Sequence, residues 1–195
     1  MFATRIRTAA VAAAIAVSMA APLASASPTA QINSGYTLVE LAPSFVGALT
    51  SLGVAPSKLL PGTLHQRIAL FPITGGRLDA SNAKGEVPHS GGLKLTSATT
   101  QVIISDFVID TTASPKLTGI VTANGSIVGR IPLFNLALPP LSLPLTLPPS
   151  PEQLLIEGNR VTLTAEAATA LNGVFGVTAF TPGFNIGIAS VYANY

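Results

Sequence analysis

The chain has 195 residues, contains no cysteine, and carries 10 Lys and Arg against 8 Asp and Glu, a formal net charge of +2. The absence of cysteine excludes disulfide bonds, thiolate metal sites and a cysteine nucleophile. Hydrophobic residues make up 48% of the chain and charged residues 9%, so a large apolar core is expected beneath a surface with few charges to separate apolar patches.

Residues 1–26 are typical of an export signal. Arg5 and Arg7 form a short basic region, an apolar stretch follows at 9–21, and Ala24-Ser25-Ala26 supplies the small residues of a signal-peptidase site. The apolar stretch is shorter than the roughly 20 residues of a membrane-spanning helix. We therefore expect a cleaved signal peptide at 1–26 and a secreted or cell-envelope protein that does not span the membrane.

Cleavage would change the charge balance. Loss of Arg5 and Arg7 leaves eight basic against eight acidic residues, and the basic residues are scattered singly rather than clustered. Nucleic-acid binding requires a clustered basic face, so we expect no nucleic-acid partner. The remaining length suits one domain, which we place at 36–195 after a polar leader at 27–35.

The domain is predicted to open with a strand and a short helix. Tyr36 to Leu41 has the composition of a strand. Within 43–52 the apolar residues recur at helical spacing, proline suits the first turn, and Gly53 suits the C-terminal cap. We therefore predict a helix over 43–52.

Strand signals dominate from His65 to Phe134. Asn124-Gly125 stands between two apolar runs, a pattern that indicates a tight hairpin. Runs rich in Val, Ile and Phe recur at roughly 8–12-residue spacing, which is typical of a sandwich or a barrel-like sheet. The sequence thus predicts a mainly β fold, an antiparallel β-sandwich with two short helices.

Residues 136–151, LALPPLSLPLTLPPSP, alternate leucine with proline and serine. Proline cannot donate to a ladder of hydrogen bonds, so one interpretation is an edge strand or a long apolar loop. The alternative is a segment that presents its leucines to a ligand or a partner.

The C-terminal part returns to regular structure. Residues 153–164 are predicted as a strand with a turn at Gly158-Asn159. Thr164 is a suitable N-cap for a helix over 165–175 that Gly176 would end. A last strand is expected over 184–192.

The side chains for catalysis or metal binding are sparse. The two histidines, His65 and His89, form no HxH or HExxH motif, so no metal site is expected. Ser90 with His89 and Asp106 or Asp110 could formally make a triad, but no G-x-S-x-G elbow presents the serine. We therefore do not expect an enzyme. Among the polar aromatics, a tyrosine phenolate could ligate ferric haem.

Several segments resemble the secreted HtaA-like domains of actinobacteria. The similarity covers roughly 36–194 and is carried by short patches: FPITGG at 71–76, GEVPHSGGL at 85–93, ISDFVIDT at 104–111, ATALN at 168–172 and FTPG at 180–183. The resemblance implies a β-sandwich that binds haem through a tyrosine and a nearby histidine. The matching positions here are Tyr36 and His89, although the tryptophan-containing opening of the family is absent.

Two functions of different classes follow. One is an exported, non-catalytic binding module for haem or another apolar ligand, with Tyr36 and His89 as ligand-binding residues. By the resemblance, Tyr36 would ligate ferric haem and His89 would hydrogen-bond or back that ligand. The alternative is a structural or adhesive cell-envelope protein that uses 136–151 to contact an envelope component.

Overall fold

The computed structural model describes residues 28–147 and 153–195, so the predicted signal peptide and residues 148–152 of the Leu/Pro segment lie outside the described residues. The described residues form 13 strands and two helices. In chain order these are β1 (Thr29–Ile32), β2 (Ser34–Leu41), α1 (Pro43–Ser51), β3 (Ala55–Leu59), β4 (Thr63–His65), β5 (Ile68–Pro72), β6 (Gly76–Asp79), β7 (Lys84–Pro88), β8 (Gly92–Thr96), β9 (Gln101–Asp110), β10 (Lys116–Ala123), β11 (Ser126–Ala137), β12 (Leu154–Leu163), α2 (Ala165–Phe175) and β13 (Asn185–Asn194).

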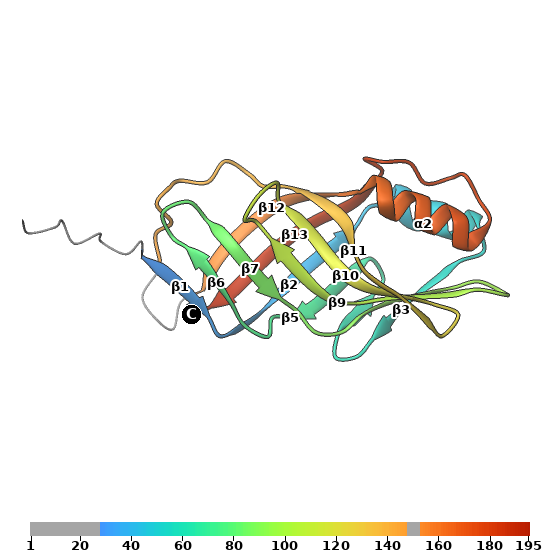
Figure 1. The fold of residues 1–195 in the computed structure, drawn as a ribbon, viewed down its shortest axis with the longest axis horizontal. Helices are drawn as coiled ribbons and strands as arrows, with labels where there is room; N and C mark the ends of the chain where they lie inside the picture. The colour runs from blue at the N-terminus through green and yellow to red at the C-terminus, as the bar shows by residue number, and fades with distance from the viewer. Residues whose placement is uncertain (1–27, 148–152) are drawn as a thin grey trace, which may run out of the picture.

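The strands form one curled antiparallel sheet (Figure 1). Its order is β1-β6-β7-β9-β10-β11-β12-β13-β2-β5-β4, and β8 pairs with β9 and with β3. The sheet curls until the end of β5 meets the end of β7, where Ile73 and His89 form a bridge. Backbone hydrogen bonds flank this bridge, from Thr74 to the Pro88 carbonyl and from Ser90 to the Pro72 carbonyl. The predicted mainly β architecture with two helices is confirmed.

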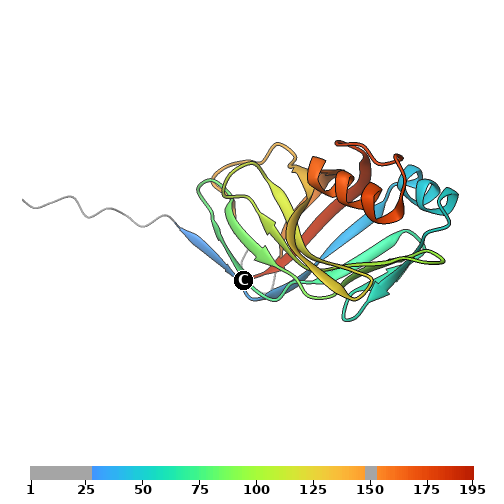
Figure 2. The ribbon, with the colours of Figure 1, turned by 45° about the vertical axis from the view of Figure 1, so that its right-hand side comes forward.

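Both helices lie at the same end of the curled sheet (Figures 1 and 2). Helix α2 has the predicted bounds, and α1 ends at Ser51, one residue before the predicted end. Thr164 Oγ1 accepts the N–H of Ala167 at the start of α2, and Gly176 ends that helix in the left-handed conformation. Within 28–147 and 153–195, neither helix is long and apolar enough to cross a membrane.

Two glycine-containing pairs behave differently. Asn124-Gly125 forms the predicted hairpin turn between β10 and β11, with φ values of 48° and 83°. The turn predicted at Gly158-Asn159 is wrong, because both residues lie inside β12. There the pairing with β13 shifts register between Ile156 and Asn159, so the glycine marks a β-bulge rather than a reversal of the chain.

The segment 27–35 that the sequence assigns to a polar leader contains strand β1. Strand β1 pairs with β6 from Thr29 opposite Asp79 to Ile32 opposite Gly76. The side chains of Ala30 and Ile32 are buried in the core. Burial of an isoleucine side chain contributes about 1.5–3 kcal/mol, which favours pairing of this short edge strand with the sheet.

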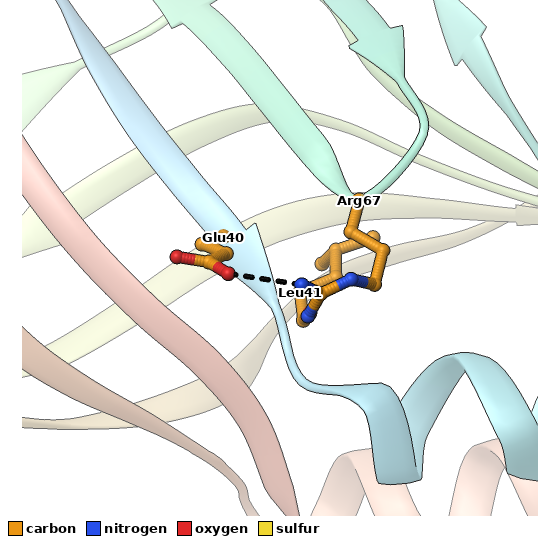
Figure 3. A network of polar contacts seen from close by, with 3 residues as sticks. All are labelled: Glu40, Leu41 and Arg67. Carbon is orange, nitrogen blue, oxygen red and sulfur yellow. Dashed lines mark hydrogen bonds and ion pairs between the residues drawn. The ribbon is translucent and has the colours of Figure 1, made fainter.

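Arg67 fixes the point at which β2 ends and the chain turns into α1 (Figure 3). Its guanidinium donates to the carbonyl oxygen of Leu41 at 3.0 Å and pairs with Glu40 at 3.2 Å. In return, the backbone N–H of Leu41 donates to the Arg67 carbonyl oxygen at 2.7 Å. Because both charged side chains are exposed, the two hydrogen bonds with Leu41 hold the end of β2 in place more than the ion pair does.

Candidate functional site

An apolar cavity of about 90 Å³ lies inside the curled sheet. Its walls are inward-facing side chains from many strands, among them Val39, Leu95 and Val161. Four polar residues of the described chain line it, and these are Thr37, His89, Thr111 and Asn159. A concave, mostly apolar space with a few polar groups is the usual form of a small-molecule site.

A bulge in β9 creates one wall of this cavity. Val102 and Ile104 face inward, and strict alternation would then turn Asp106 inward as well. Instead Asp106 adopts a positive φ of 50°, and the pairing with β10 shifts register at this point. The next inward residues are therefore Phe107 and Ile109. The bulge keeps the carboxylate outside and places two large apolar side chains on the wall.

His89 lies at the point where the sheet closes and is only 5% exposed. Its Nε2 is hydrogen-bonded to Thr37 Oγ1 at 2.7 Å. Burial lowers the pKa of His89 to about 4, while the backbone carbonyls of Val87 and Phe107 act in the opposite direction. Nδ1 makes no hydrogen bond of good geometry to any described residue. Because the pKa is about 4, the ring is neutral at physiological pH.

Asn159 is 3% exposed and is held by the bulge in β12. Its amide nitrogen donates to the carbonyl oxygens of Ile156 at 2.9 Å and Ala189 at 3.0 Å. These two bonds fix the amide orientation, and Oδ1 is left without a hydrogen-bond partner among the described residues. A buried carbonyl without a partner is uncommon, because it loses its hydrogen bonds to water on folding.

The described part of the Leu/Pro segment covers the protein's own interior. Leu138 and Leu141 line the cavity, and Leu145 and Leu147 pack against the core. The N–H of Leu145 donates to the Ala80 carbonyl oxygen at 2.6 Å, which ties the loop to the sheet. Leu143, in contrast, is 51% exposed.

Tyr36 and His89 are not brought together. Tyr36 precedes Thr37 in β2, so the two side chains lie on opposite faces of the sheet. Thr37 faces inward to His89, whereas Tyr36 is 38% exposed and stacks on Tyr192 of β13, with ring centroids 4.7 Å apart. The ligand-binding roles expected of Tyr36 and His89 remain predictions, and they concern side chains on opposite faces of the sheet.

The groups considered for catalysis are also dispersed. The hydrogen bond that the structure describes for the His89 ring joins it to Thr37 and not to the adjacent Ser90. The carboxylate of Asp106 accepts a hydrogen bond from the hydroxyl of Ser105. His65 is exposed at the end of β4. Across residues 28–147 and 153–195, no group of three His, Cys, Asp or Glu side chains is placed to hold a metal ion.

Sequence reasoning identified His89 but missed Thr37 and Asn159. The alternation of Thr37, Val39 and Leu41 is the signal that places Thr37 on the inner face of β2. Asn159 carried no such signal, because an Asn after a Gly is more often part of a turn than of a bulge.

No family model matches the chain, and no curated protein matches its sequence. Among solved structures it is similar to the C-terminal domain of HtaA from Corynebacterium glutamicum, with a TM-score of 0.65 and 17% identity over 84% of this chain and 98% of that domain. A domain-swapped dimeric variant of that domain matches with a TM-score of 0.53 and 17% identity over 76% and 90% of the two chains. The haem-binding protein HtaB from the same organism matches with a TM-score of 0.55 and 11% identity over 86% and 96%. The resemblance to HtaA predicted from sequence is confirmed at the level of the fold.

Proposed function

We propose that this protein is a non-catalytic binding module that holds a small apolar ligand inside the curled sheet. The observation that carries the proposal is the interior cavity of about 90 Å³ with its almost entirely apolar wall. Close packing normally leaves few voids larger than a water molecule in a protein interior. Apolar cavities stay dry and accept apolar guests, so an enclosed space of this kind is suited to ligand uptake.

The described part of the Leu/Pro segment favours this function over a structural or adhesive envelope role. An adhesive role needs the leucines at the surface. Instead Leu138 and Leu141 line the cavity. Within the described residues 136–147, Leu143 is the leucine that lies mostly at the surface. The segment therefore acts as part of the wall around the ligand.

Filling the cavity tests the proposal. Ala189 lines the cavity on β13, so Ala189→Leu places three further carbons in the space for the ligand. Ala137→Leu is the matched control, because Ala137 is exposed near the end of β11. Binding of 1-hexanol is followed through the NMR shifts of methyl groups on the wall, such as those of Val39 and Val191.

We expect saturable shifts of these methyl groups in the wild type and in Ala137→Leu, and their loss in Ala189→Leu. Shifts that do not saturate in the wild type, or that are the same in both variants, would refute binding in the cavity. Thermal unfolding of each variant checks that the fold is retained.

Haem is a second candidate ligand, favoured by the shared fold with HtaB. The interior cavity does not fit it, since sites for drug-sized ligands are about 300–1,000 Å³ and this space is about 90 Å³. In the part of the chain that the structure describes, no lysine or arginine lines the cavity to pair with propionates. A haem ligated by Tyr36 would therefore lie on the outer face of β2, beside Tyr192, without contact to His89.

A hemin titration separates the two ligands. If haem is bound, the Soret shift saturates at one equivalent, is lost in Tyr36→Phe and persists in the neighbouring control Tyr192→Phe. Absorbance that does not saturate, or that is unaffected by Tyr36→Phe, would exclude Tyr36 as the ligand. Neither outcome depends on the interior cavity.

We also propose that the protein acts outside the cytoplasm, which rests on the sequence of residues 1–26. Intact-mass measurement of protein recovered from culture supernatant should find a chain that begins at Ser27. A secreted species that retains Met1 would contradict this.

A further inference from the structure

A second cavity, of about 40 Å³, lies between α2 and the sheet. It is lined by side chains of the helix such as Ala167, Ala170 and Val174, and by sheet residues such as Val102 and Leu163. Every described residue of its wall is apolar, so a molecule in this space would find no hydrogen-bonding side chain among them.

The two cavities share part of their walls. Five residues line both, namely Phe45, Leu95, Ile104, Phe134 and Ile186. These come from α1, β8, β9, β11 and β13, and we call them the shared wall. The smaller cavity extends under α2, because Ala167, Ala170 and Val174 line it and do not line the larger one.

We propose that the ligand is a neutral molecule with an unbranched hydrocarbon chain, whose far end passes the shared wall and lies under α2. This rests on the proposed function, because it assumes that the larger cavity is the binding site. A flexible methylene chain can pass a constriction between two small lobes, whereas a rigid ring system cannot. Side-chain rotamer changes of Phe45 or Phe134 would widen the constriction at modest energetic cost.

The distribution of polar groups sets the orientation of the chain. The polar residues that the described chain contributes to the combined wall, Thr37, His89, Thr111 and Asn159, all belong to the larger cavity. The methyl end therefore lies under α2 and the head group lies in the larger cavity. Among residues 28–147 and 153–195, no Lys, Arg, Asp or Glu lines either cavity, so a charged head group would be buried without a partner from them. An alcohol or an ester meets this requirement and a carboxylate does not.

The test titrates 1-alkanols with four to twelve carbons into the wild type and into two variants, each of which replaces one alanine of α2 by leucine. Ala170→Leu fills the second cavity, which Ala170 lines without reaching the first. Ala165→Leu is the matched control, because Ala165 is exposed at the start of α2 and lines neither cavity. Transfer of one methylene from water to an apolar site is worth about 0.8 kcal/mol, or about fourfold in affinity.

In the wild type and in Ala165→Leu, affinity should rise about fourfold per methylene until both cavities are filled. In Ala170→Leu, the short alcohols should bind as in the wild type, and the rise should stop at a shorter chain. Decanoate at pH 8 should bind at least tenfold more weakly than 1-decanol.

The outcomes distinguish the two proposals. Failure of every alcohol to bind would overturn the proposed function and this inference with it. Binding of short alcohols, with the same limiting chain length in the wild type and in Ala170→Leu, would overturn only the inference. Equal affinity for cyclodecanol and 1-decanol would do the same. Ala167→Val, a smaller change in the same cavity, serves if Ala170→Leu does not fold.

Discussion

The hydroxyl of Thr37 lies 2.7 Å from Nε2 of His89, a contact between side chains 52 positions apart in the sequence. It joins β2 to the bridge at which the sheet closes. Thr37 is the hydrogen-bond partner that the structure describes for the His89 ring, which is almost fully buried.

Replacing Thr37 by valine should therefore destabilise the protein. Thr37→Val keeps the side-chain shape but leaves Nε2 buried without a partner, which costs about 1–3 kcal/mol. Thr122→Val, at a half-buried position on β10, should change the free energy of unfolding by less than about 0.5 kcal/mol. Urea unfolding of both variants measures the difference, and equal stabilities would show that the contact is not stabilising.

Stability should fall as the pH drops below the ordinary pKa of histidine. The pKa of His89 is about 4 in the folded protein against 6.5 ordinarily, so the unfolded state binds more protons between these values. The contribution is complete above pH 6.5 and is lost as the pH falls towards 4, for a total of about 3 kcal/mol.

Unfolding free energies at pH 7 and pH 4.5 test this in His89→Gln and His65→Gln. The first variant should lose most of the pH dependence. The second should retain it, because His65 is exposed. An unchanged pH dependence in His89→Gln would assign the effect to other groups.

Two glycine-to-alanine changes should have opposite signs. A Cβ at Gly92 would collide with the backbone carbonyl oxygen of Ile104 in the paired strand β9, so Gly92→Ala should destabilise the sheet by more than about 2 kcal/mol. Gly47 lies inside α1 with open space around it, and Gly47→Ala should stabilise by about 0.5–1 kcal/mol. Thermal unfolding of both variants checks the signs, and a stabilising Gly92→Ala would contradict the pairing of β8 with β9.

Within the Leu/Pro segment, Leu141→Ser and Leu143→Ser should differ. Leu141 is on the cavity wall, so serine there should reduce stability by about 1–3 kcal/mol and weaken ligand binding. Leu143 is half exposed, and its replacement should leave both properties nearly unchanged. Loss of surface attachment in Leu143→Ser, with ligand binding intact, would instead support the adhesive role.

The features that could be predicted from the sequence are those set by neighbouring residues. Thr164 begins α2 and Gly176 ends it through contacts within a few positions. Asn124 and Gly125 are adjacent, and their own backbone conformations form the turn between β10 and β11. The order of strands depends on pairing between distant segments, which no local pattern encodes. The bulges at Asp106 and Asn159 were missed for the same reason, because each is defined by the register of a partner strand.

Strand β13, the last strand in chain order, lies in the sheet between β12 and β2. Its residues pair along β2 from Gly187 opposite Leu41 to Asn194 opposite Ser34. Until those residues are synthesised, β2 and β12 each have an unpaired edge, and the sheet stays open between these two strands. Pairing over such a sequence separation slows folding, since a large loop must close before its contacts are gained. The growing polypeptide therefore cannot complete its native sheet until β13 has been made.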